Sequence, residues 1–193
     1  ESNLAGIHHE ATGRFILEPK TMSFGGAYRV PRLEGRWLSV DVDMNAVVNR
    51  DSGALEGGYG SVMAERPLFS SRTEWAWSST TKFANQLKRR YVNAEVASFT
   101  PSYVDPASAS PAEHVPWMWR ERSVHQEVKV TRSFGWETKN DVSLGGAFSH
   151  ADYRAPAIGA DGTVLDPRAV AELTKAAVPV GENRVGPFVQ WHS

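Results

Sequence analysis

The sequence predicts an all-β protein, an antiparallel up-and-down meander that forms part of a transmembrane outer-membrane β-barrel. Seven segments alternate apolar and polar residues with the period of two that is typical of strands. The connections between these segments alternate between short and long. No apolar run approaches the roughly 18 residues that a membrane-spanning helix requires. We therefore expect any membrane crossing to be made by strands.

Residues 1–19 are interpreted as a lead-in or as the first barrel strand, and residues 20–193 as a partial barrel domain. The expected strands within that domain are 20–30, 38–48, 55–66, 72–83, 122–134, 142–153 and 184–193. Most are about 10–13 residues long, which exceeds the roughly 5–6 residues of typical globular strands. About 9–11 tilted residues suffice to cross a bilayer.

The segment 38–48 shows the clearest alternation. Its polar residues Asp41, Asp43 and Asn45 are expected to face the barrel lumen. Its predicted membrane-facing residues are Leu38, Val40, Val42, Met44 and Val48. A soluble antiparallel sheet can alternate in the same way, with one face on a core and the other in water. The glycine-rich run 57–60 lies in the next strand and is interpreted as a site of strand bending.

The lengths of the connections separate the two ends of the predicted sheet. Tight turns are expected at 31–35, 67–71 and 135–141, and long loops at about 84–121 and 154–183. Outer-membrane barrels have short periplasmic turns and longer extracellular loops. In the first long loop, 91–99 is expected to form a short strand, and the proline-rich 98–116 an irregular, poorly paired loop.

A helix over residues 168–177 is expected in the second long loop. Asp166 supplies an N-cap and Pro167 occupies the first helical position.

Seven tryptophans suggest an aromatic girdle at the membrane surface. Trp75 and Trp77 share a face near the start of a strand, and both are predicted to face the membrane. Trp37, Trp136 and Trp191 fall at or near strand ends. The alternative is that these rings fill a soluble core. The mean hydropathy of -0.39 is compatible with a barrel, because each strand gives only alternate positions to lipid.

Charge and cysteine content limit the partners. The net charge is -1 and the pI about 6.7, so the chain is not expected to bind nucleic acid. The basic run 88–90 at the base of a long loop could contact lipopolysaccharide phosphates, or could be a solvated loop base. The absence of cysteine excludes disulfides and thiolate metal sites.

The sequence does not indicate an enzyme, a metal site or a cofactor. Asp41 and Asp43 could form a pair of glycosidase carboxylates, which lie about 5–9.5 Å apart. Any two neighbours on one strand face have a similar separation, so the spacing does not indicate catalysis. The histidines lack metal-ligand spacing, and no nucleophile elbow or phosphate loop is found.

Two turn sequences carry a resemblance to a known family. The first turn contains Pro31, Leu33, Gly35 and Arg36, and the second contains Pro67, Leu68 and Phe69. With the aromatic strand before the first turn, they resemble the early barrel of the bacterial surface-antigen family, which includes the BamA- and TamA-like insertases and translocators. Arg32 and Trp37 replace the Asn and final Gly of the family's first turn.

The resemblance implies a place in the bacterial outer membrane and a role in assembling or exporting proteins. The partners that it implies are outer-membrane lipid and lipopolysaccharide, with unfolded outer-membrane proteins or secreted polypeptides as possible clients. The family's late-barrel motif and its POTRA repeats are not found, and the chain is expected to be a fragment of a longer barrel. A passive porin-like barrel and a soluble sandwich or lipocalin-like binding domain remain alternatives.

Overall fold

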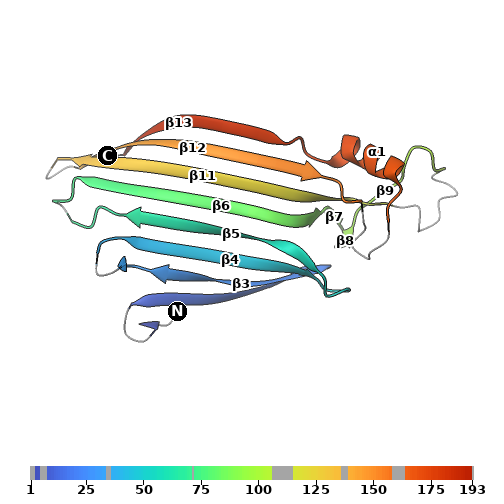
Figure 1. Cartoon of the computed structure of the whole chain (residues 1–193), viewed down its shortest axis with the longest axis horizontal. Coiled ribbons are helices and arrows are strands. Elements are labelled where there is room, and N and C mark those ends of the chain that lie inside the picture. Colours follow the sequence, from blue (N-terminus) through green and yellow to red (C-terminus); the bar gives the residue numbers. More distant parts are fainter. Residues whose placement is uncertain are drawn as a thin grey trace.

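The chain is all-β except for one helix in a computed structural model, which describes residues 3–4, 8–33, 36–70, 72–105, 115–135, 139–157 and 164–192. Its main sheet is a purely antiparallel meander in the order β1-β2-β3-β4-β5-β6-β11-β12-β13 (Figure 1). Every long strand of this sheet pairs with the strands next to it in that order. The sheet is open, because no described strand joins β13 to the opposite edge.

The strands of the main sheet agree closely with those predicted from alternation. They are β1 (Asn3–Leu4), β2 (His9–Leu17), β3 (Thr21–Val30), β4 (Ser39–Asn49), β5 (Leu55–Arg66), β6 (Trp75–Arg89), β11 (Met118–Phe134), β12 (Asn140–Arg154) and β13 (Glu182–His192). The largest difference is β6, which extends six residues beyond the predicted end. The first long connection therefore comprises residues 90–117, and the second 155–181.

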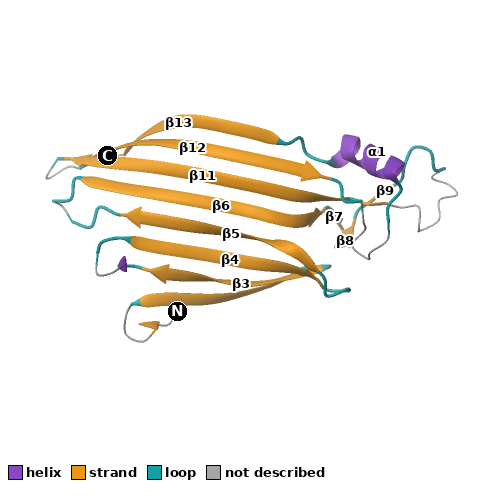
Figure 2. Ribbon diagram, in the orientation of Figure 1, coloured by secondary structure: helices purple, strands orange, loops and turns teal. Residues whose placement is uncertain are grey.

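Both long connections lie at the same end of the sheet (Figure 2). The turns between β3 and β4, β5 and β6, and β11 and β12 lie at one end, which we call the short-turn end. The two long connections lie at the other end, which we call the long-loop end, together with the turns at residues 18–20 and 50–54.

The long connections form a small packed unit at the long-loop end of the sheet, here called the loop cap (Figure 1). It consists of β7 (Tyr91–Val92), β8 (Glu95–Val96), β9 (Ser98–Phe99), β10 (Val115–Pro116) and α1 (Pro167–Ala177). β7 pairs with β8, and β9 with β10. The prediction that 98–116 would pair poorly is thus wrong at both ends of that segment; residues 106–114 lie outside the described part.

The helix begins as its sequence predicts. The Asp166 side chain accepts a hydrogen bond of 2.8 Å from the Arg168 backbone N–H, and Pro167 is the first helical residue. Val115, Ala169 and Leu173 form the buried centre of the loop cap.

Within the described ranges, no helix combines the length and the apolarity needed to cross a membrane.

Candidate membrane-facing surface and polar cavity

One face of the main sheet is apolar and largely exposed. Residues that are directly paired across the ladder lie on the same face, so Met44, Val62 and Phe83 belong with Val128 and Leu144. The exposed large apolar side chains of this apolar face are Phe15, Leu17, Phe24, Tyr28, Met44, Leu55, Val62, Trp75, Trp77, Phe83, Val124, Val128, Val130, Phe134, Leu144, Phe148, Val185, Val189 and Trp191.

The predicted membrane-facing residues of β4 and β6 lie on this face with different exposure, and Leu38 directly precedes β4. Met44 is 54% exposed and Trp75 is 51% exposed. Trp77 is also exposed, and Leu38, Val40 and Val42 are half-buried. Val48 is only 8% exposed, because it lies beside a β-bulge at the long-loop end of β4.

Charged residues border the apolar stretch at both ends on β11. Arg122 and Arg132 lie on the apolar face with Val124, Gln126, Val128 and Val130 between them. The Arg132 guanidinium lies 5.1 Å from the centre of the Trp75 ring and 4.9 Å from that of Phe134. Aromatic and cationic groups therefore meet at the short-turn border of this face.

A polar network interrupts the centre of the apolar face. The Thr81 hydroxyl donates to the Gln126 side-chain oxygen, and the Gln126 amide donates to the Ser79 hydroxyl over 3.0 Å. The three side chains satisfy one another, which lowers the cost of polar groups on an apolar surface.

The opposite face is polar, and both aspartates of β4 on this face are paired with arginines. Asp43 lies 2.9 Å from the Arg14 guanidinium, and Asp41 lies 3.4 Å from that of Arg29. The Asn45 amide also donates to Asp43 over 2.5 Å. The two carboxylates that were considered as a glycosidase pair are therefore each bound to an arginine of a neighbouring part of the sheet.

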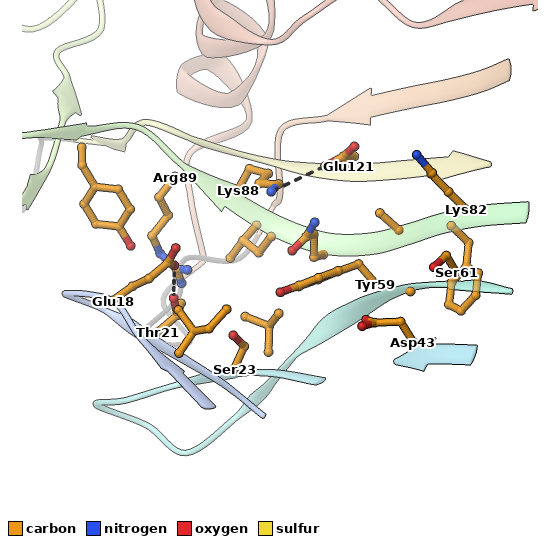
Figure 3. A pocket seen from close by; sticks show the side chains of 18 residues that line it. Glu18, Thr21, Ser23, Asp43, Tyr59, Ser61, Lys82, Lys88, Arg89 and Glu121 are labelled. Atoms are coloured by element: carbon orange, nitrogen blue, oxygen red, sulfur yellow. Dashed lines mark hydrogen bonds and ion pairs between the residues drawn. The ribbon is translucent and has the colours of Figure 1, made fainter. Parts of the chain in front are cut away.

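This polar face contains a cavity of about 640 Å³ near the long-loop end (Figure 3). Charged groups of both signs line it: Glu18, Asp43, Lys82, Lys88, Arg89 and Glu121. The Thr21 hydroxyl donates to Glu18 over 2.6 Å, and the Lys88 ammonium lies 4.0 Å from Glu121. The Tyr59 and Ser61 side chains point into the same space (Figure 3).

A buried ion pair and a hydrogen bond to it join three strands at the edge of this cavity. The Arg89 guanidinium binds both carboxylate oxygens of Glu56, and these side chains are only 3% and 6% exposed. Glu56 also accepts a hydrogen bond of 2.9 Å from the Asn49 amide. We call these three residues the junction network, because they connect the ends of β4, β5 and β6.

The junction network depends on a β-bulge at the glycine-rich run. Val47 pairs with Gly57 and Val48 with Leu55, so Glu56 is the extra residue. Gly57 has a φ of 130°, and a Cβ there would lie 1.9 Å from the Asn85 carbonyl oxygen. Only glycine fits this position, in agreement with the prediction of bending in this run.

The basic run 88–90 does not form a single patch. Arg89 is buried in the junction network, Lys88 lies beside Glu121, and Arg90 lies 4.5 Å from the centre of the Trp117 ring. Arg89 therefore does not belong to a solvated loop base, whereas the Lys88 and Arg90 side chains are exposed, in agreement with that alternative. No local pattern in the sequence predicts the pairing of Arg89 with Glu56, because the two residues are 33 positions apart.

The two turn motifs lie side by side at the short-turn end. Pro31, Leu33 and Arg36 belong to the first turn, and Pro67, Leu68 and Phe69 to the second. The Trp37 and Phe69 rings stack with centres 4.7 Å apart, and the Arg32 guanidinium lies 4.0 Å from the centre of Trp37. Of the two residues that depart from the family pattern, Trp37 makes the contact between the turns, and Arg32 packs on Trp37. Gly35 and Trp136 lie outside the described residues.

The loop cap is held by polar contacts between the two long connections. Glu172 of α1 accepts hydrogen bonds from the Ser102 backbone N–H, over 2.7 Å, and from its hydroxyl, over 2.8 Å. These bonds hold the pKa of Glu172 below its usual value of 4.5. The Tyr103 hydroxyl donates to Asp166 over 3.0 Å.

Across the part of the chain that the structure describes, no group of His, Asp and Glu side chains could hold a metal ion. Comparisons with protein-family models, with curated proteins and with solved structures find no match to this chain.

Proposed function

We propose that this chain forms part of the wall of a bacterial outer-membrane β-barrel of the surface-antigen type, which assembles or exports proteins. The observation that carries the proposal is the exposed apolar face, which extends over eight long strands while the opposite face is polar. Soluble monomers rarely expose contiguous apolar patches larger than about 300–600 Å². In a bilayer such a face contacts lipid tails, so its apolar surface is not exposed to water.

The height of the apolar face suits a bilayer. Ten residue steps separate Arg122 from Arg132, which corresponds to about 33 Å along the strand. With a strand tilt of about 35–45°, the vertical distance is about 25 Å, the height of the apolar band on outer-membrane barrels. Trp75, Trp77 and Trp191 lie near the short-turn border, where a girdle belongs. This orientation puts the short turns in the periplasm.

The role in assembly or export is supported by the turn motifs and by the sheet edges. The outer edge of β13 pairs with no other described strand and exposes backbone donors and acceptors. In lipid such groups must be paired, by further barrel strands or by the strand of a client protein. Clients of this kind are unfolded outer-membrane proteins or secreted polypeptides.

Site-directed spin labelling tests the orientation of the wall. The chain has no cysteine, so each single-cysteine variant carries one label. Val62→Cys places it on the apolar face of β5, and Ser61→Cys places it on the polar face. In vesicles, the label at 62 should be relaxed by lipid-soluble oxygen, and the label at 61 by a water-soluble nickel complex. Reversed accessibility would contradict the proposal. A monodisperse chain without detergent would favour the soluble ligand-binding alternative.

A folding assay tests the assembly role. Vesicles that contain the chain should accelerate the folding of an added unfolded outer-membrane protein several-fold, measured by heat-modifiable gel migration. Vesicles with an unrelated passive porin are the control. The polar cavity, with its charges of both signs, favours a passive transport barrel as second candidate. Ion conductance without faster client folding would support that candidate instead.

A further inference from the structure

A groove of about 770 Å³ lies on the apolar face toward the long-loop end. Its apolar walls are formed by Phe24, Met44, Ala46, Leu55, Phe83 and Val124. Six strands supply its lining, and they are consecutive in the sheet in the order β3, β4, β5, β6, β11 and β12. The volume falls within the roughly 300–1,000 Å³ of typical ligand sites.

The floor of the groove is backbone. Gly58 lines the groove and pairs with Ala46 of β4, so neither strand carries a large side chain there. A Cβ at Gly58 would lie 2.6 Å from the Asn45 carbonyl oxygen. The larger side chains of Met44 and Phe83 stand on either side of this floor. The result is a long apolar recess open on its outer side.

Polar groups gather at one part of the groove lining, near the long-loop border of the apolar face. They are Asn85, Arg122 and His150. Among the described residues Arg122 forms no ion pair, and its ladder partner Asp152 is paired with Arg154 at 2.8 Å. His150 shares a hydrogen bond of 2.6 Å with Asn183 through its Nδ1, which leaves Nε2 for another partner.

The charge near Arg122 is positive. Arg120 and Arg154 are paired across the ladder beside Arg122 and Asp152, so three guanidinium groups surround one carboxylate. The Arg120 guanidinium donates to the Asn85 side-chain oxygen over 3.2 Å, which holds it beside the groove. An anion is therefore favoured at the polar part of an otherwise apolar recess.

We propose that this groove binds a membrane lipid with an anionic phosphate headgroup, one acyl chain lying in the groove and the phosphate at Arg122. The proposal rests on the proposed membrane wall and adds a specific lipid site to it. The guanidinium fork matches phosphate oxygens, and Nε2 of His150 can supply a further hydrogen bond. The apolar walls then contact the acyl chain at the depth where lipid tails begin.

Native mass spectrometry of the detergent-solubilised chain tests the site. The probes are dimyristoyl phosphatidylglycerol and dimyristoyl glycerol, which share acyl chains but differ in the phosphate headgroup. We expect saturable binding of one phosphatidylglycerol and at least tenfold weaker binding of the diacylglycerol. Arg122→Gln should weaken phosphatidylglycerol binding about tenfold or more, because a charge-assisted contact is lost.

Groove-filling variants test the acyl-chain part. Ala46→Phe should abolish lipid binding. Met44→Trp should weaken lipid binding, and its larger side chain remains outside the sheet because Met44 is exposed. The matched controls are Arg132→Gln, on the same face of the same strand, and Ala64→Phe, on the same face of β5 but outside the groove. Both controls should bind as the unchanged chain does.

The outcomes separate this proposal from the membrane wall itself. Non-saturable binding, equal binding of the two lipids, or equal losses in Arg122→Gln and Arg132→Gln would overturn the lipid site. The spin-label result at positions 61 and 62 would stand in those cases. If the label at 62 is instead reached only by the aqueous probe, the wall and the lipid site both fall.

Discussion

The main sheet and the loop cap differ in the exposure of their apolar side chains. In the loop cap, Leu173 is 0% exposed, Ala169 is 1% exposed, and Val115 packs with them. In the sheet, Leu144 is 62% exposed and Val189 is 68% exposed on the apolar face. The same chain therefore buries leucine and valine side chains in one region and presents residues of the same types outward in another.

This contrast is what the proposed membrane wall predicts, with the loop cap in water and the sheet in lipid. The loop cap follows the rule of water-soluble proteins, in which apolar surface is removed from water. The sheet satisfies its backbone through strand pairing and leaves apolar side chains outside, as a wall in lipid does. We therefore expect substitutions in the sheet and in the loop cap to have different effects on the stability of the chain in vesicles.

The largest effect is expected at the junction network. Glu56→Gln leaves the buried Arg89 guanidinium without its carboxylate and should reduce the free energy of unfolding by about 3–5 kcal/mol. Asp43→Asn is the control, since its ion pair with Arg14 is partly exposed and should cost about 1 kcal/mol or less. Urea titration in vesicles measures both. Equal losses would show that burial of the Glu56 pair is unimportant.

The second-largest effect is expected at the centre of the loop cap. Leu173→Ala removes a fully buried side chain and should cost about 2–5 kcal/mol, limited to the loop cap. Hydrogen exchange should therefore increase in α1 while the amides of β4 and β5 keep their protection. Exchange that increases equally throughout the sheet would show that the two regions do not differ in this way.

An arginine on the apolar face tests the sheet. Val128→Arg lies between Arg122 and Arg132, near the centre of the apolar stretch, and should destabilise the chain in vesicles by about 2–4 kcal/mol. Ala147→Arg is the control on the polar face, where it faces Glu127 across the ladder. The control should be close to neutral in the same urea titration. A neutral Val128→Arg would contradict a lipid-facing surface.

The smallest effect is a pH dependence of the loop cap. The folded pKa of Glu172 is lowered by the Ser102 hydrogen bonds, so its stabilisation is complete above the usual value of 4.5. It is lost as the pH falls through the lowered folded pKa. The hydrogen-exchange protection factors of α1, which are corrected for the intrinsic pH dependence of amide exchange, should then decrease below about pH 4.5. Glu172→Gln should remove this dependence; a dependence that persists would assign it to another group.

The sequence alone predicted most of the sheet because alternation is a local signal. β5 was predicted at its observed bounds, and the start of α1 follows from Asp166 and Pro167. β2 was left open between a lead-in and a strand, since His9 and Gly13 weaken its alternation. β6 was predicted too short because its last residues are basic, and its extension depends on pairing with β11.

Sequence by itself determined the division into apolar and polar faces and the separation of short turns from long loops, because both are periodic along the chain. Only the tertiary structure decided which distant residues meet. The pairing of Glu56 with Arg89 requires the bulge at Gly57, and the stacking of Trp37 on Phe69 requires neighbouring turns. The groove above Gly58 likewise depends on strand register, which aligns residues far apart in the chain.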